Sequence, residues 1–127
     1  MRISLTTIYV DDQDQALRFY TEVLGFAKKD DFTRGPFRWL TVSAAEGGTQ
    51  LQLASNHHPA GKAFQAALFA QGQPAVMFET DDVDADCARI QARGGALVMP
   101  PTDVTGARIA KGTDGCGNLF QLTQLAR

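Results

Sequence analysis

The chain has 127 residues, of which 44% are apolar, 20% charged and 9% aromatic, a composition typical of one soluble globular domain. Its formal net charge is −2 and its Lys and Arg residues are scattered, which argues against nucleic acid or an anionic membrane as partner. No apolar run approaches the roughly 18 residues of a membrane span, and the N-terminus shows no secretory signal, so we expect a cytoplasmic protein.

The first half predicts a strand, a helix and three further strands. Asp11 or Asp12 caps the helix, whose apolar residues recur at i, i+3, i+4, i+7 and i+8 and so form one buried stripe. Gly25 stands where a helix end favours a left-handed residue. Alternating apolar and polar residues, separated by glycine-rich turns, mark the strands. We expect them near residues 3–10, 26–33, 37–43 and 49–54.

The second half predicts the same order of elements after a short linking helix at residues 62–71. A helix at residues 83–93 follows the first of its strands, and the prolines Pro100 and Pro101 are expected to end the second. The strands are expected near residues 75–80, 96–99, 106–111 and 118–125.

These two halves form an internal repeat. The acidic pattern at residues 11–14 recurs at residues 81–84, an offset of 70, and Gln52 recurs as Gln121, an offset of 69. Both acidic clusters are interpreted as helix caps, not as metal sites. The chain is therefore predicted to be one α+β domain, residues 1–127, built from two tandem βαβββ modules. The modules span residues 1–56 and 73–127, joined by the linker helix near residues 60–72.

Cysteine and histidine offer little chemistry in this pattern. We interpret Cys87 as a buried helix residue and Cys116 as a free surface thiol, with no disulfide between them. His57 and His58 would point in opposite directions on a strand, and Pro59 follows at once. They are interpreted as a solvated loop pair at the mouth of a cleft in preference to a metal site.

Two stretches carry a family resemblance that covers nearly the whole chain: VDDQDQALRFYTEVLGF from Val10 and DGCGNLFQL from Asp114. The sequence resembles the vicinal oxygen chelate superfamily, which includes glyoxalase I, bleomycin-resistance proteins, fosfomycin-resistance proteins and extradiol dioxygenases. The resemblance implies a glyoxalase-like curved mixed sheet whose two halves face each other around a cleft, with the helices on the outer face. It also implies a two-fold homodimer, since members of this family are commonly dimers.

Metal-dependent members of that superfamily place one metal ligand at the centre of each of four strands. The positions that match here hold an alkyl chain, a methyl group and two neutral amides, without a carboxylate to offset the charge of an ion. We therefore expect no metal ion, no other cofactor, and neither glyoxalase nor dioxygenase activity. The four residues are Leu5, Gln52, Ala75 and Gln121.

Without a metal, the expected site is a mainly apolar cleft with a few polar groups, which is the usual composition of a small-molecule site. The favoured interpretation is a binding protein of the bleomycin-resistance type for a small organic molecule. An alternative is a metal-independent isomerase or lyase that uses Glu79 or Tyr9 as acid or base. Glu79 and Trp39 also have a purely structural interpretation. Glu79 would lie near the end of its strand, solvated or paired with an arginine, and Trp39 would be an ordinary core residue. The expected lining residues are Leu5, Thr7, Tyr9, Trp39, Gln50, Gln52, Ala75, Met77, Glu79, Gln121 and Thr123.

Overall fold

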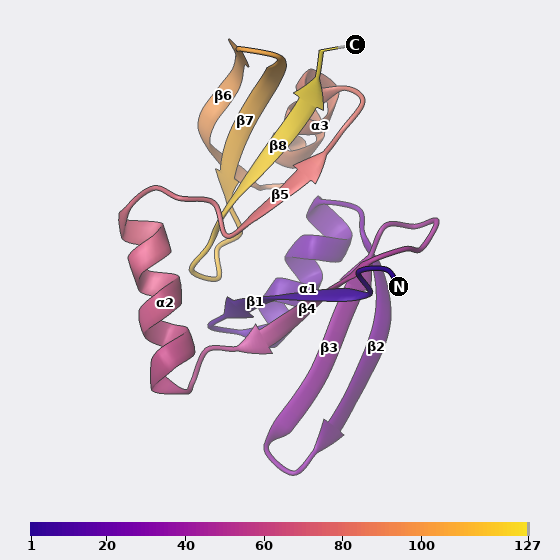
Figure 1. Ribbon diagram of the computed structural model, residues 1–127, viewed down its shortest axis with the longest axis vertical. Coiled ribbons are helices and arrows are strands. Elements are labelled where there is room, and N and C mark those ends of the chain that lie inside the picture. Colours follow the sequence, from indigo (N-terminus) through magenta and orange to yellow (C-terminus); the bar gives the residue numbers. More distant parts are fainter. Residues whose placement is uncertain (127) are drawn as a thin grey trace.

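The computed structural model describes residues 1–126 as two similar halves, each a four-stranded sheet with a helix on one face (Figure 1). The first half contains β1 (Leu5–Val10), α1 (Gln13–Arg18), η1 (Phe19–Val23), β2 (Ala27–Arg34), β3 (Phe37–Ser43) and β4 (Gln50–Ser55). After the linker α2 (Pro59–Ala70), the second half contains β5 (Val76–Glu79), α3 (Val83–Ala92), β6 (Ala96–Val104), β7 (Ala107–Thr113) and β8 (Leu119–Leu125).

The two sheets have the same topology. Their strand orders are β1-β4-β3-β2 and β5-β8-β7-β6, and in each the first strand runs parallel to the last one in sequence. The remaining neighbours are antiparallel. The predicted α+β fold of two βαβββ units is confirmed. No helix formed by residues 1–126 is both long and apolar enough to cross a membrane.

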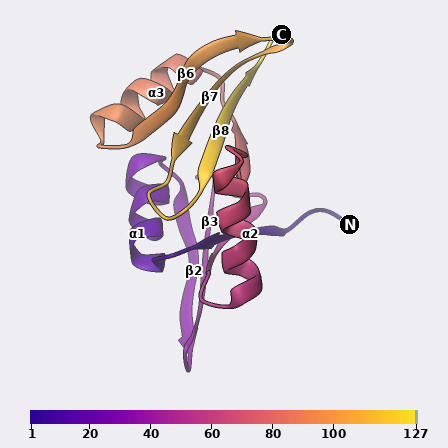
Figure 2. The same cartoon turned by 90° about the vertical axis from the view of Figure 1, so that its left-hand side faces the viewer.

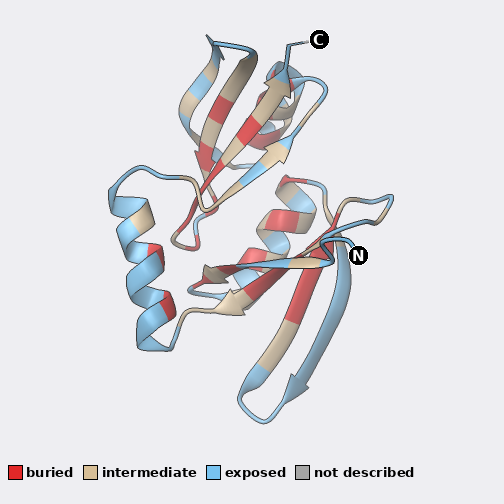
Figure 3. Ribbon diagram, in the orientation of Figure 1, coloured by how far each residue is buried: buried red, intermediate tan, exposed pale blue. Residues whose placement is uncertain are grey.

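One apolar core joins the halves. Tyr20, from the π-helical segment η1 that continues α1, and Phe120, from β8, are both fully buried. The ring of Phe19 lies 5.3 Å from that of Tyr20 and 5.8 Å from that of Phe120. Figure 3 shows this buried region where α1 meets the lower end of the second sheet. The first helix therefore packs on its own sheet and also supports the second one.

The acidic clusters cap helices in both halves, as the repeat predicts. Asp12 precedes α1 and its carboxylate accepts a hydrogen bond from Gln15 N at 3.0 Å. Asp82 precedes α3 and accepts from Ala85 N at 3.0 Å. These bonds satisfy backbone donors that the first helical turn leaves unpaired.

A second repeated contact ties each helix to its sheet. Arg38 on β3 binds Asp14 at 2.6 Å, and Arg108 on β7 binds Asp84 at 2.9 Å. The hydrogen bond from Arg108 lowers the pKa of Asp84. Because each pair recurs at the same repeat position, we attribute both to the fold and not to ligand chemistry.

Three local predictions were wrong. α2 begins at Pro59 instead of residue 62, because proline suits the first turn of a helix. β6 continues through Pro100 and Pro101, because it is an edge strand and both prolines lie in the irregular stretch between Met99 and Thr102, where no residue is paired with β7. Cys116 is fully buried instead of exposed, because its loop packs against the first half of the chain.

Candidate functional site

The site predicted from sequence maps onto the sheet faces that α1 and α3 do not cover. Both helices lie on the same side of their sheets, on the left in Figure 2. Leu51 and Leu53 on β4, and Leu122 on β8, are buried on this helix side. The residues between them point to the opposite, open face, because side chains alternate along a strand.

Gln52 lies at the centre of the first open face. It is 9% exposed, and its Oε1 accepts a hydrogen bond from the hydroxyl of Thr7, its neighbour on β1, at 2.8 Å. Gln52 is paired on its other side with Thr41 on β3, so that the three residues form a row across the strands. Leu5 and Gln50 form the pair two residues earlier on the same two strands. The amide is thus held in place by Thr7 at the bottom of this face.

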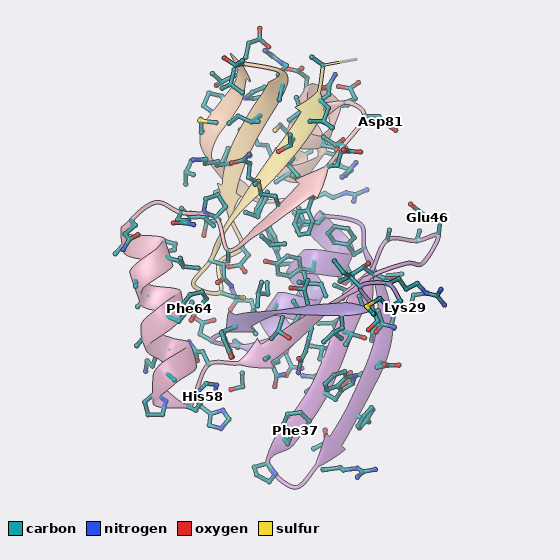
Figure 4. All side chains as sticks on the ribbon, in the orientation of Figure 1. Lys29, Phe37, Glu46, His58, Phe64 and Asp81 are labelled. Carbon is teal, nitrogen blue, oxygen red and sulfur yellow. The ribbon has the colours of Figure 1, made fainter. Side chains whose placement is uncertain are left out.

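Aromatic side chains occupy the outer part of the first open face. Trp39 on β3 stacks on its cross-strand neighbour Phe32, with ring centroids 6.4 Å apart and planes 23° from parallel. The indole N–H of Trp39 donates to Asp30 at 3.3 Å. Phe32 and Phe37 are each 50% exposed, and Figure 4 shows Phe37 near the end of the β2–β3 hairpin. Trp39 is therefore part of an aromatic shelf and not of the core.

The second open face has an unbroken cross-strand row. Gln121 on β8 is flanked by Met77 on β5 and by Lys111 on β7, and Lys111 in turn pairs with Met99 on β6. The amide of Gln121 donates to Thr123 at 3.1 Å. Lys111 was missed in the sequence because its strand was expected to end there. The register with Gln121, once known, identifies it.

The structure brings some of the predicted residues together and separates others. Thr7, Tyr9 and Ala75 line a small cavity beside α2, together with Phe64. Glu79 pairs with Thr123 in the next row of the second sheet and lines a different cavity. Gln52 and Gln121 lie on separate sheets of one chain. Tyr9 and Glu79, either of which was predicted as an acid or base, line different cavities.

The two histidines have local roles at the start of α2. His58 caps the helix, with its Nδ1 accepting from Gly61 N at 3.1 Å, and its ring meets Tyr9 edge-on at 5.3 Å. His57 Nδ1 lies 2.7 Å from the hydroxyl of Ser55. Both side chains are exposed, and Figure 4 shows His58 beside the first turn of α2. Sequence reasoning missed the cap, although proline after a polar residue is a helix-start signal.

The four positions that match the metal ligands of metal-dependent superfamily members do not fit a metal ion here. Leu5 and Ala75 carry no donor atom, and the Oε1 of Gln52 already accepts from Thr7. Within residues 1–126, no three His, Cys, Asp or Glu side chains gather in a group that could hold a metal ion. We therefore derive no chemistry through a metal at this site.

A buried polar network at the junction of the halves was not foreseen. Asp114 is 1% exposed and accepts from the hydroxyl of Tyr20 at 2.7 Å and from Nδ2 of Asn118 at 2.9 Å. It also accepts from the backbone N–H groups of Cys116 and Asn118 at 2.7 and 3.0 Å. Burial and the neighbouring charge of Asp114 raise the pKa of Tyr20 well above its usual value. This network fixes the β7–β8 loop against the first helix.

The linker helix is tied into the same junction by Gln65, which is buried. Its amide nitrogen donates to the carbonyl oxygens of Tyr9 at 2.8 Å and Cys116 at 2.9 Å, while its oxygen accepts from Asn56 at 2.7 Å. α2 therefore holds the end of β1 and the β7–β8 loop together.

Two four-stranded mixed sheets, each with its helix on one side, define a glyoxalase-like fold. The family model described as Glyoxalase/Bleomycin resistance protein/Dioxygenase superfamily matches residues 2–122. The chain belongs to this superfamily, as its two motifs indicate.

Several relatives match along their full length. YurT of Bacillus subtilis (strain 168), an uncharacterized protein, is 44% identical over 126 residues, which cover 98% of this chain and 99% of YurT. The crystal structure of UcmS2 is 32% identical, covers 97% of both chains and superposes with a TM-score of 0.84. TnmS3 from Streptomyces sp. CB03234, described as an antibiotic binding protein, is 32% identical, covers 99% of this chain and 97% of its own, with a TM-score of 0.81.

Proposed function

We propose that the protein binds a small organic molecule, without metal, in a cleft that two chains of a homodimer form together. The first open face of one chain and the second open face of its partner would make its two walls. The protein then acts by sequestering its ligand. The observation that carries this proposal is the presence of two neutral amides and two alkyl side chains at the four positions that match the metal ligands of metal-dependent superfamily members.

The chemistry of the open faces suits such a ligand. Trp39 and Phe32 offer a flat aromatic shelf, and Met77, which is 64% exposed, offers an adaptable apolar surface. Gln52 and Gln121 supply neutral donors and acceptors for a carbonyl, hydroxyl or amide group. A predominantly apolar wall with a few fixed polar groups is the usual composition of a small-molecule site.

The amount of exposed surface supports a partner chain. Residues of this protein expose 7457 Å² of accessible surface, for a mass of 13.7 kDa. A compact monomer of that mass exposes about 6,600 Å². The excess, about 850 Å², is close to the area that each partner buries in a standard protein interface. We propose that a second copy covers it, with the two chains related by a two-fold axis.

A relative supports ligand binding, and the cysteines support a cytoplasmic location. TnmS3 is described as an antibiotic binding protein and matches this chain over nearly its whole length. Cys87 and Cys116 are both buried and not linked by a disulfide, which suits a reducing compartment such as the cytoplasm.

A thermal-shift screen of metabolites and antibiotics tests this function. A ligand that binds the native state alone raises stability by RT ln(1 + [L]/Kd). We expect a hit whose effect falls in Gln52→Leu and Gln121→Leu, while both variants unfold in the absence of ligand much as the wild type does. If every hit stabilises both variants as strongly as the wild type, the amides take no part in binding and the proposal fails. Metal added without ligand should produce no comparable shift.

A further inference from the structure

The second open face carries a cation at its centre. Strands β5–β8, which are all described, contain two cationic residues, Arg108 and Lys111. Arg108 points to the helix side, where Asp84 and Asp103 hold it. Lys111 is the cross-strand partner of Gln121 and so shares the open face with it.

Among residues 1–126, no side chain forms an ion pair or a hydrogen bond with this cation. The Lys111 side chain is half-buried. Its neighbours along the row are the amide of Gln121 and the thioether of Met99. Glu79 lies one row further along and two strands away, beside Thr123. An ammonium in this setting is available to a bound group of opposite charge.

The repeat shows that the fold does not require a cation here. Residues that the fold does require recur in both halves, as Arg38 and Arg108 do. The counterpart of Lys111 at the repeat offset of 70 is Thr41. Thr41 is fully buried, and its hydroxyl accepts from the backbone N–H of Asp30. Lys111 thus distinguishes the two walls chemically, which is expected of a specificity residue and not of a structural one.

We propose that Lys111 sets the ligand specificity of the cleft by binding an anionic group, such as a carboxylate, a sulfonate or an ionised phenol, on an otherwise apolar or aromatic molecule. Gln121 hydrogen-bonds the same group from the adjacent strand, while Met77 and Met99 contact the apolar part. This inference rests on the proposed function, because it assigns the ligand class of that same cleft. A charge-assisted hydrogen bond accounts for about tenfold in affinity or more.

The test uses two fluorescent probes that share one ring system. Anilinonaphthalenesulfonate carries a sulfonate, and N-phenylnaphthylamine lacks it. Each is titrated into wild-type protein, Lys111→Met, Lys111→Arg and the control Lys62→Met, which removes an exposed lysine on α2. We expect Lys111→Met to weaken the sulfonate about tenfold and to leave the neutral probe within about twofold. Lys111→Arg should retain sulfonate binding, and Lys62→Met should change neither affinity.

The outcomes separate this inference from the proposed function. The variant Trp39→Ala tests whether the dyes bind in the cleft, because Trp39 lies on its other wall. If the neutral probe binds and is weakened by Trp39→Ala, but Lys111→Met leaves the sulfonate unchanged or weakens both probes equally, the role of Lys111 is refuted and the cleft stands. If the wild type does not bind the sulfonate, the role of Lys111 is likewise refuted, whereas the proposed function is decided by the thermal-shift screen. Thermal unfolding of each variant shows whether a loss of affinity reflects a loss of fold.

Discussion

Replacing Asp114 with alanine tests the junction between the two halves most severely. The side chain is 1% exposed and accepts four hydrogen bonds, two from backbone N–H groups and two from the side chains of Tyr20 and Asn118. Alanine removes all four acceptor contacts at once. The donors then stay buried without a partner unless the β7–β8 loop opens to water.

The expected loss of stability follows from this count. A buried donor left unsatisfied costs about 1–3 kcal/mol. If loop movement restores water to two of the four donors, two remain, and the free energy of unfolding falls by about 3–5 kcal/mol. Tyr20→Phe removes one donor and leaves Asp114 three, so it costs about 1.5 kcal/mol. In the Asp114→Ala background the same change should cost almost nothing, because the hydroxyl has already lost its acceptor.

Urea unfolding followed by far-UV circular dichroism at one fixed protein concentration measures all four members of this cycle. Asp103→Ala is the matched control, since its carboxylate is 83% exposed in the ion pair with Arg108 and should contribute about 0.5 kcal/mol or less. A loss below about 1 kcal/mol for Asp114→Ala, or additive effects of the two junction mutations, would refute the network as a major source of stability.

Elemental analysis after dialysis should find no stoichiometric zinc, nickel, manganese or iron; about one equivalent per chain, lost in Gln52→Ala, would contradict the donor argument. Light scattering at tens of micromolar should give the mass of two chains, and a monomer mass would contradict the shared cleft. Burial raises the pKa of Cys116 to about 12, so the folded chain keeps protons that an unfolded thiol releases near pH 8.5. Stability should therefore fall as pH rises above about 8.5, with a shallower slope in Cys116→Ala, and an unchanged slope would refute this assignment. Both thiols should react with a thiol reagent only after unfolding, and rapid reaction in the native protein would show that they are accessible.

Much of the fold follows from short-range signals in the sequence. β3 spans residues 37–43 as predicted, because its alternation is bounded by two glycine turns. Capping by Asp12 and Asp82 follows from residue type and spacing. The burial of Leu51, Leu53 and Leu122 follows from strand parity, which also places the two glutamines on the open faces.

What the sequence did not reveal depends on contacts between distant segments. Cys116 lies in a glycine-rich loop and was expected at the surface, because nothing local indicates that Tyr20 and Gln65 cover that loop. Lys111 becomes notable only when its register with Gln121 is known. The side-by-side placement of the open faces depends on how the halves pack, and periodicity contains no information on that.

Mixing two binding-defective variants shows whether two chains share each ligand cleft. Gln52→Leu damages the first wall and Gln121→Leu the second, and each alone should weaken the strongest ligand from the screen. After subunit exchange, half of the dimers contain one chain of each kind, and one of their two clefts has both glutamines intact. If two chains share each cleft, about one quarter of the wild-type binding capacity returns, at wild-type affinity. If each cleft lies within one chain, every cleft in the mixture carries one mutation and no high-affinity binding returns, which would contradict the shared cleft.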